Sequence, residues 1–160
     1  MSFTDIQLPY PVIAEIYKNH LVALTHQNSI QYLGKNFRKI LVLVNYNVEV
    51  FLPEIQLEFL EKILLACKLN LGDIAIVNTA RQARKLDEYI REFDPASILV
   101  FGTNDPIDNE FPGMETFKPA KQQGFILMMA PSLEKLNEEN PESKQLKAMF
   151  WHSLKQFFSI

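Results

Sequence analysis

The chain has a single cysteine, Cys67, among 160 residues, which excludes an internal disulfide and a cysteine-based zinc or iron–sulfur site. Its three histidines are too dispersed to suggest a metal site. No apolar run approaches the roughly 20 residues that a membrane helix needs, and the first residues lack the features of a secretory signal. With 16 basic against 19 acidic residues, the total charge gives no general reason to bind nucleic acid. We therefore expect a soluble cytoplasmic protein without a metal or another cofactor.

Glycine is also scarce, with 5 residues, and its absence at particular places excludes several enzyme classes. A dinucleotide site needs Gly-x-Gly-x-x-Gly after the first strand, where this sequence has Asn45-Tyr-Asn-Val-Glu-Val50. Neither a Walker phosphate loop nor the Gly-x-Ser-x-Gly turn of serine hydrolases occurs in the chain. Without glycine the backbone cannot easily turn its amides toward a phosphate, so no nucleotide-binding loop is predicted.

Apolar runs alternate with amphipathic helical patterns from about residue 36 onward. Strands are expected at residues 39–45, 73–77, 97–101 and 124–129. The runs contain little polar alternation, which is typical of strands that are buried on both faces. Strands that alternate with helices favour parallel pairing and right-handed crossovers. We therefore predict one α/β domain over residues 36–160, with three α/β/α layers and a central, mainly parallel sheet of about four strands.

Helices are expected after the first two strands and at the C-terminus. The first begins at Pro53 and should end at Gly72, because proline suits a first turn and glycine a stop. The second should begin at the capping box Thr79–Gln82. The last begins at the cap Asn140 and has an apolar face that extends to Phe158.

Two segments lie outside this alternation. Residues 103–122 contain three prolines and are expected to form a long loop at the carboxyl edge of the sheet, where ligands usually bind in parallel sheets. Residues 1–35 are expected to form an N-terminal arm with a short helix opened by Pro11. Either this arm packs on the sheet, or it is a segment that binds a partner.

Residues 128–155 resemble the C-terminal part of uracil-DNA glycosylase-like proteins. In that family the last strand ends in His-Pro-Ser or His-Pro-Ala, and a short helix, an Asn-Pro pair and a helix with a tryptophan follow. The matching residues here are Pro131, Ser132, Asn140-Pro141 and Trp151. The resemblance implies the fold of this family.

The catalytic positions of that family differ in this chain. Ala130 stands in place of the histidine that stabilises the leaving uracil, and a methyl group donates no hydrogen bond. The Gly-rich motif with an acidic residue after the first strand is replaced by Asn45-Tyr46-Asn47, with Glu49 nearby. The resemblance therefore implies a protein that is not an enzyme.

A vestige of the glycosylase pocket is nevertheless expected at one end of the sheet. The loop after the first strand and the end of the last strand should lie close together there. The residues expected in this vestigial pocket are Asn45, Asn47, Ala130, Pro131 and Ser132.

Residues 101–106, Phe-Gly-Thr-Asn-Asp-Pro, resemble a Gly-Thr-Asp-Glu-Pro turn in the psi subunits of bacterial DNA polymerase III, which are non-enzymatic relatives of the glycosylase fold. Psi subunits share the later order of a strand, a Ser-Pro segment, Asn-Pro and a tryptophan helix. The resemblance implies an accessory subunit of the holoenzyme that bridges the clamp loader to other replication proteins through a chi-like subunit, with at most indirect DNA contact. The arm would bind the clamp loader through Leu8, Tyr10, Ile13, Ile16 and Tyr17.

Two other hypotheses fit the same sequence. The first is a divergent glycosylase-fold protein that binds or processes a nucleobase, with Asn45 or Asn47 reading the base edge. The second is an α/β protein-interaction domain of an unrelated assembly. This second hypothesis shares the fold prediction and differs only in the partner.

Overall fold

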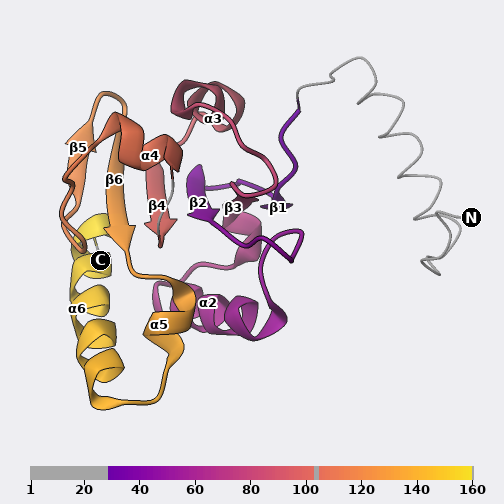
Figure 1. Cartoon of the computed structure of the whole chain (residues 1–160). Helices are drawn as coiled ribbons and strands as arrows, with labels where there is room; N and C mark the ends of the chain where they lie inside the picture. The colour runs from indigo at the N-terminus through magenta and orange to yellow at the C-terminus, as the bar shows by residue number, and fades with distance from the viewer. Residues whose placement is uncertain (1–28, 103–104, 160) are drawn as a thin grey trace, which may run out of the picture.

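The computed structural model describes residues 29–102 and 105–159, and six strands of this part form one sheet of order β1-β3-β2-β4-β6-β5 (Figure 1). The strands are β1 (Leu33–Gly34), β2 (Ile40–Val44), β3 (Ile74–Asn78), β4 (Ser97–Phe101), β5 (Ala120–Gln122) and β6 (Phe125–Ala130). The helices are α2 (Glu54–Ala66), α3 (Leu86–Phe93), α4 (Asp105–Glu110), α5 (Leu133–Asn137) and α6 (Pro141–Phe158), with a 3-10 turn at Leu71–Asp73. The protein is therefore an α/β protein, as predicted.

The four central strands are the four that the sequence predicts. β2 pairs in parallel with β3 and with β4, and β4 pairs in parallel with β6. All five residues of β2 are buried, as the absence of polar alternation indicates. The prediction of about four strands was incomplete, because β1 and β5 add an antiparallel strand at each edge.

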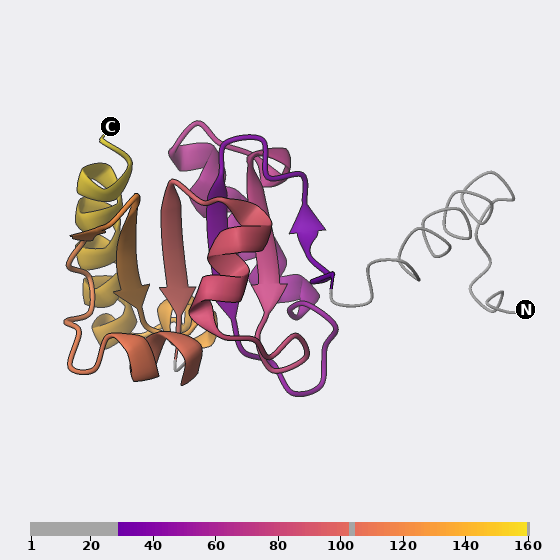
Figure 2. The same ribbon diagram turned by 90° about the horizontal axis from the view of Figure 1, so that it is seen from above.

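Helices cover both faces of the sheet, and successive residues of β2 point to opposite sides. Val42 packs in one core with Leu60 of α2 and Phe150 of α6. The next residue, Leu43, packs in a second core with Tyr89 of α3. Figure 2 shows α3 and α4 in front of the sheet and α2 and α6 behind it. This arrangement explains why the central strands are apolar on both sides.

Two predicted helix boundaries were wrong. α2 ends at Ala66 and not at Gly72, because Lys68 already adopts a left-handed backbone with φ of 62°. α3 begins at Leu86 and not at the predicted capping box of Thr79–Gln82. Thr79 does not cap this helix; its hydroxyl donates to the carbonyl oxygen of Val44 at 3.0 Å.

The predicted loop over residues 103–122 also needs correction. α4 occupies residues 105–110, and β5 pairs with β6 from residue 120. Between them, Thr116 forms an isolated parallel bridge to Met129. The segment is therefore a helix and an edge strand joined by a shorter connection.

The folded unit begins before the predicted boundary at residue 36. Ile30 is buried in the second core, and β1 pairs with β3 through Leu33 and Gly34. The arm residues predicted to bind a partner, Leu8, Tyr10, Ile13, Ile16 and Tyr17, lie outside the described residues. Within residues 29–102 and 105–159, no helix is both long and apolar enough to cross a membrane.

Candidate functional site

The loops that follow β2, β4 and β6 line an open pocket of about 240 Å³ at the carboxyl edge of the sheet. It is lined by Asn45, Tyr46, Asn47, Phe101, Gly102, Ser132, Leu133 and Glu134. Parallel strands end at the same edge, so the three loops meet as expected from the sequence. The parallel pairing of β2, β4 and β6 is enough to bring the three loops together, and the same arrangement occurs in other doubly wound sheets.

Three of the five residues predicted for this pocket line it, namely Asn45, Asn47 and Ser132. The other two do not. Ala130 is buried in the core at the end of β6, with 4% of its surface exposed, and Pro131 is not among the lining residues. The site at the end of β6 therefore offers the Ser132 side chain and no group from position 130.

The turn after β4 lies directly against the turn after β6. The amide of Gly102 donates to the carbonyl oxygen of Ala130 at 2.9 Å. Gly102 has φ of +78°, and a Cβ built there would lie 3.6 Å from the Cβ of Ser132. A glycine at this position allows the left-handed turn. Ser132 in turn caps α5 by accepting a hydrogen bond from the amide of Lys135 at 3.3 Å.

Tyr46 and Glu134 form the polar pair of the pocket. Burial raises the pKa of the Tyr46 phenol well above its ordinary value, and a hydrogen bond to Glu134 and the charges of Glu134 and Glu49 raise it further. The phenol therefore stays neutral and donates to the Glu134 carboxylate. Two carboxylates near the pocket make it unfavourable for a phosphate or another anion and favourable for a neutral or cationic group.

The loop after β2 is held by one residue that the sequence analysis did not select. Asn78, at the end of β3, is fully buried. Its side-chain nitrogen donates to the carbonyl oxygens of Tyr46, Glu49 and Val50 at 2.8, 2.9 and 3.3 Å, and its oxygen accepts from the amide of Tyr46 at 2.9 Å. A polar residue that closes an otherwise apolar strand was the available signal. Asn78 thus fixes the backbone of one pocket wall.

Two neighbours of Asn78 complete this support. The amide of Thr79 donates to the carbonyl oxygen of Val44 at 2.8 Å, and the guanidinium of Arg81 donates to the carbonyl oxygen of Val48 at 2.7 Å. The side chains of Asn78 and Arg81 satisfy backbone carbonyl groups of the loop, which therefore keeps its shape without glycine. Val48 and Val50 project from it with 77% and 57% of their surface exposed. An ordered loop with an apolar tip therefore borders the pocket.

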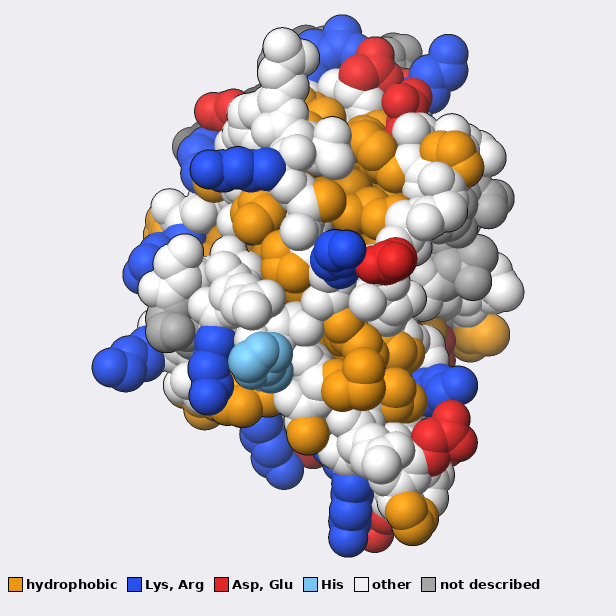
Figure 3. All heavy atoms as spheres, turned by 90° about the vertical axis from the view of Figure 1, so that its left-hand side faces the viewer, with side chains coloured by type: hydrophobic (Ala, Val, Ile, Leu, Met, Phe, Trp, Pro, Cys, Tyr) orange, Lys and Arg blue, Asp and Glu red, His pale blue; other side chains and the backbone are white. Residues whose placement is uncertain are grey.

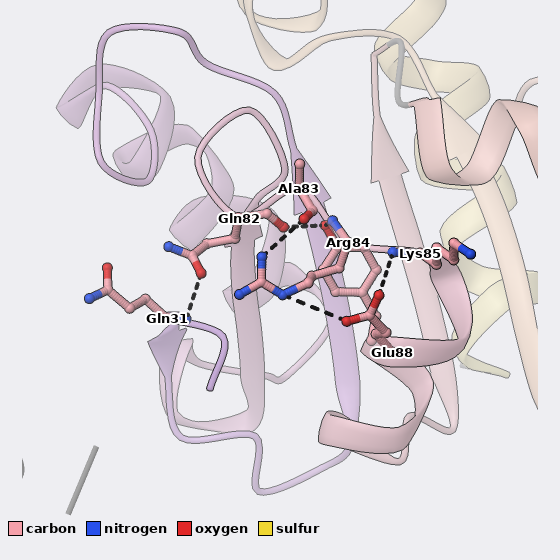
Figure 4. A network of polar contacts seen from close by, with 7 residues as sticks. Gln31, Gln82, Ala83, Arg84, Lys85 and Glu88 are labelled. Atoms are coloured by element: carbon pink, nitrogen blue, oxygen red, sulfur yellow. Dashed lines mark hydrogen bonds and ion pairs between the residues drawn. The ribbon is translucent and has the colours of Figure 1, made fainter. Parts of the chain in front are cut away.

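A second polar network holds the segment between β3 and α3 in place (Figure 4). The amide of Gln31 donates to the side-chain oxygen of Gln82 at 3.3 Å, and the Tyr89 hydroxyl donates to the Gln82 carbonyl oxygen. Arg84 lies 3.8 Å from the Glu88 carboxylate and donates to the Ala83 carbonyl oxygen. This network joins Gln31, near the start of the described residues, to the segment that precedes α3.

Reactive groups are few at these sites. Among the described residues, no group of three or more His, Cys, Asp or Glu side chains is arranged to hold a metal ion. Cys67 is buried, and burial raises the pKa of its thiol, which lowers its nucleophilicity. The chemistry that the pocket offers is hydrogen bonding by amides, a hydroxyl, a neutral phenol and carboxylates.

Neither a protein-family model nor a curated protein matches this chain significantly. The function is therefore inferred from the pocket, from the two motifs that meet beside it, and from the surface of the domain.

Proposed function

We propose that this chain is a non-catalytic, psi-like accessory subunit of the DNA polymerase III holoenzyme. Its domain then has the three-layer uracil-DNA glycosylase-like fold, and the protein is cytoplasmic. It bridges the clamp loader to other replication proteins through a chi-like subunit, and it contacts DNA at most indirectly. The N-terminal arm, with Tyr17 as its central aromatic residue, is the clamp-loader contact.

The main support is the resemblance of residues 101–106 to psi subunits and of residues 128–155 to glycosylase-like proteins. The parallel pairing of β4 and β6 brings these two segments side by side. Gly102 belongs to the Gly-Thr-Asn-Asp-Pro motif and Ala130 precedes the Pro-Ser motif, and a hydrogen bond of 2.9 Å joins their backbones. The Asn-Pro pair, which is part of the resemblance, stands at the start of α6. Asn140 accepts from the amide of Ser143 at 2.8 Å and so caps α6, the helix that contains Trp151. Motifs separated in the sequence are thus parts of one local structure.

The non-catalytic part of the proposal is supported by the side chains around the pocket. Position 130 has a methyl group, which gives no hydrogen bond to a departing base. The carboxylate of Glu134, which lines the pocket, accepts a hydrogen bond from the Tyr46 phenol.

A pull-down from the lysate of the source cells tests the proposal. The bait is the tagged full chain, compared with a form that lacks residues 1–28. This truncation keeps Ile30, which is buried in the core. A matched pair of full-length variants refines the test, with Tyr17→Ala as the test and Asn19→Ala as the polar control in the same arm.

The expected result is recovery of clamp-loader subunits by the full chain and by N19A, and their loss with the truncation and with Y17A. Recovery of other proteins in their place would favour an α/β interaction domain of an unrelated assembly. Recovery of no clamp-loader subunit would overturn the proposal.

One observation favours a second candidate, a protein that binds or processes a nucleobase. Asn45, Asn47 and Ser132 line the same pocket, and amide groups pair well with the edge of a base. Release of free uracil from a uracil-containing oligonucleotide by the wild-type chain, lost in Asn47→Ala, would support this candidate. No release, with clamp-loader recovery in the pull-down, leaves the psi-like role.

A further inference from the structure

An apolar groove of about 230 Å³ runs between α2 and α6, away from the pocket described above. Its apolar lining residues are Phe59, Ile63, Ala66, Phe150, Trp151 and Leu154. On α2, Ile55 lies one turn before Phe59 and is 64% exposed, so the apolar surface continues past the groove. A surface of this kind, built from two long helices, is typical of a site that receives an amphipathic segment.

Lysines surround this groove. Lys62 and Lys147 line it, and Lys144 and Lys155 lie on α6 at helical spacing from Lys147 and Trp151. The ammonium of Lys147 lies 5.6 Å from the centre of the Phe59 ring, and that of Lys155 lies 5.5 Å from the centre of the Trp151 ring. Figure 3, which faces the side of the molecule with α6, shows Lys and Arg side chains along its lower and left margins with hydrophobic side chains between them.

The positive charge at the groove is not compensated by ion pairs. The ion pairs within residues 29–102 and 105–159 are those of Arg84 with Glu88, Lys118 with Glu115 and Lys135 with Glu142, and none includes a lysine of the groove. The acidic residues of α2 lie on a neighbouring stripe of the helix, at Glu54, Glu58 and Glu61. Four lysines therefore lie in or beside one apolar surface, and its nearest carboxylates, Glu58 on α2 and Glu138 and Glu139 beside Lys144, form no ion pair with them among the described residues.

We infer that this groove binds an acidic amphipathic segment of a partner protein, with apolar side chains in the groove and carboxylates against Lys62, Lys144, Lys147 and Lys155. The charge of the rim selects an acidic ligand, and the apolar floor selects one with hydrophobic anchors. The inference does not depend on which complex the protein serves, because it rests on the groove alone.

The same observations disfavour two other occupants. A second copy in a symmetric contact would bring two lysine-rimmed grooves together, and like charges would repel. A single-stranded nucleic acid binds by stacking on exposed aromatic faces. Here Phe150 is buried in the core, and lysines lie over the rings of Phe59 and Trp151.

The test uses the full chain and synthetic peptides, because Trp151 is the only tryptophan and its emission reports on the groove. The probe is an amphipathic peptide of about 18 residues with leucines on one helical face and glutamates elsewhere. Two peptide controls replace its glutamates by lysines or its leucines by serines, and an oligothymidylate serves as the nucleic acid. Binding is measured by Trp151 fluorescence and by anisotropy of labelled probes at two salt concentrations.

The acidic amphipathic peptide is expected to bind with a Kd of about 1–100 μM, to shift the Trp151 emission to shorter wavelength, and to weaken at high salt. The variant K147E/K155E should bind at least about tenfold more weakly. The control K85E/K121E changes the net charge equally, at exposed lysines outside the groove, and should bind as the wild type does.

Each contrary outcome would overturn the inference. These outcomes are absence of binding, equal binding of the serine-substituted peptide, tighter binding of the lysine peptide or the oligothymidylate, and equal weakening by both double variants. A dimer in solution that K147E/K155E disrupts would assign the groove to a second copy instead. None of these outcomes depends on clamp-loader recovery, so the groove and the psi-like role are tested separately.

Discussion

Asn78 binds both backbone polar groups of Tyr46, a residue 32 positions earlier in the chain. The Tyr46 amide donates to the Asn78 oxygen at 2.9 Å, and the Asn78 nitrogen donates to the Tyr46 carbonyl oxygen at 2.8 Å. This two-point contact joins the end of β3 to the loop after β2. It places the Tyr46 side chain in the pocket, where the phenol meets Glu134. One buried amide therefore determines the geometry of a pocket wall.

Replacing Asn78 by alanine should lower the free energy of unfolding by about 2–4 kcal/mol, because several backbone groups of the 45–50 loop lose their partner. Urea denaturation measures this loss. Asn109→Ala, at an exposed position of α4, is the matched control and should change stability by less than about 0.5 kcal/mol. Equal effects of the two substitutions would contradict the role assigned to Asn78.

The central strands and the last helix could be predicted because local sequence determines them. β2, β3, β4 and β6 are almost continuous apolar runs. This pattern is typical of strands that are buried on both faces of a sheet. α6 begins with the cap Asn140 followed by Pro141, as predicted. The common edge of the parallel strands then placed Asn45, Asn47 and Ser132 in one pocket.

The remaining features depend on contacts between distant segments. β1 has two residues and pairs only at the edge, so it leaves no alternating pattern. Thr79 resembles a helix cap in sequence, yet its hydroxyl is bonded to Val44, and the helix begins later. In the sequence, Asn78 is recognisable only as the polar residue that ends a strand. Its hydrogen bonds to the loop form because residues 46–50 pack against it. The groove between α2 and α6 likewise requires two helices from opposite ends of the domain.

The protein should lose stability steeply above pH 10, in part through Tyr46. Burial, the main cause, raises the pKa of this phenol in the folded state, so its contribution is complete below the unfolded value of about 10 and is lost as the unfolded chain ionises above it. Each buried phenol lowers the free energy of unfolding by at most about 1.4 kcal/mol per pH unit in this range. Burial also raises the pKa of Tyr89, which adds to the same effect.

Urea denaturation at several values between pH 8 and pH 11.5 distinguishes the contribution of Tyr46. Tyr46→Phe should be less stable than the wild type at pH 8 by about 1 kcal/mol, since it loses a hydrogen bond, and should decline less steeply above pH 10. Glu134→Gln keeps the buried phenol and should retain most of the wild-type slope. If the stability of the wild type and of Y46F fell in parallel with pH, Tyr46 would not be buried from solvent as the structure shows.

Gly34→Ala tests whether the edge strand β1 belongs to the folded domain. A Cβ at this position would lie 2.2 Å from the carbonyl oxygen of Ile74 and 2.7 Å from that of Leu71, and φ is +105°. The backbone must shift to admit the methyl group, so the free energy of unfolding should fall by about 3 kcal/mol or more. Gly113→Ala is the control, with φ of +74° and no atom within 4 Å of the added carbon. The free energy of unfolding of this control should fall by about 1 kcal/mol, which measures the conformational strain alone.

The face that α6 turns to the sheet can be tested at two consecutive residues. Phe150 is buried, and its ring centre lies 5.7 Å from that of Phe101 and 6.1 Å from that of Phe117, whereas Met149 is 53% exposed. Phe150→Leu should therefore cost about 1–2 kcal/mol in thermal or urea denaturation, through lost ring contacts and a small cavity. Met149→Leu should cost less than about 0.5 kcal/mol. A rotation of α6 by one residue would reverse this order, and it would also turn Trp151 and Lys147 away from the groove.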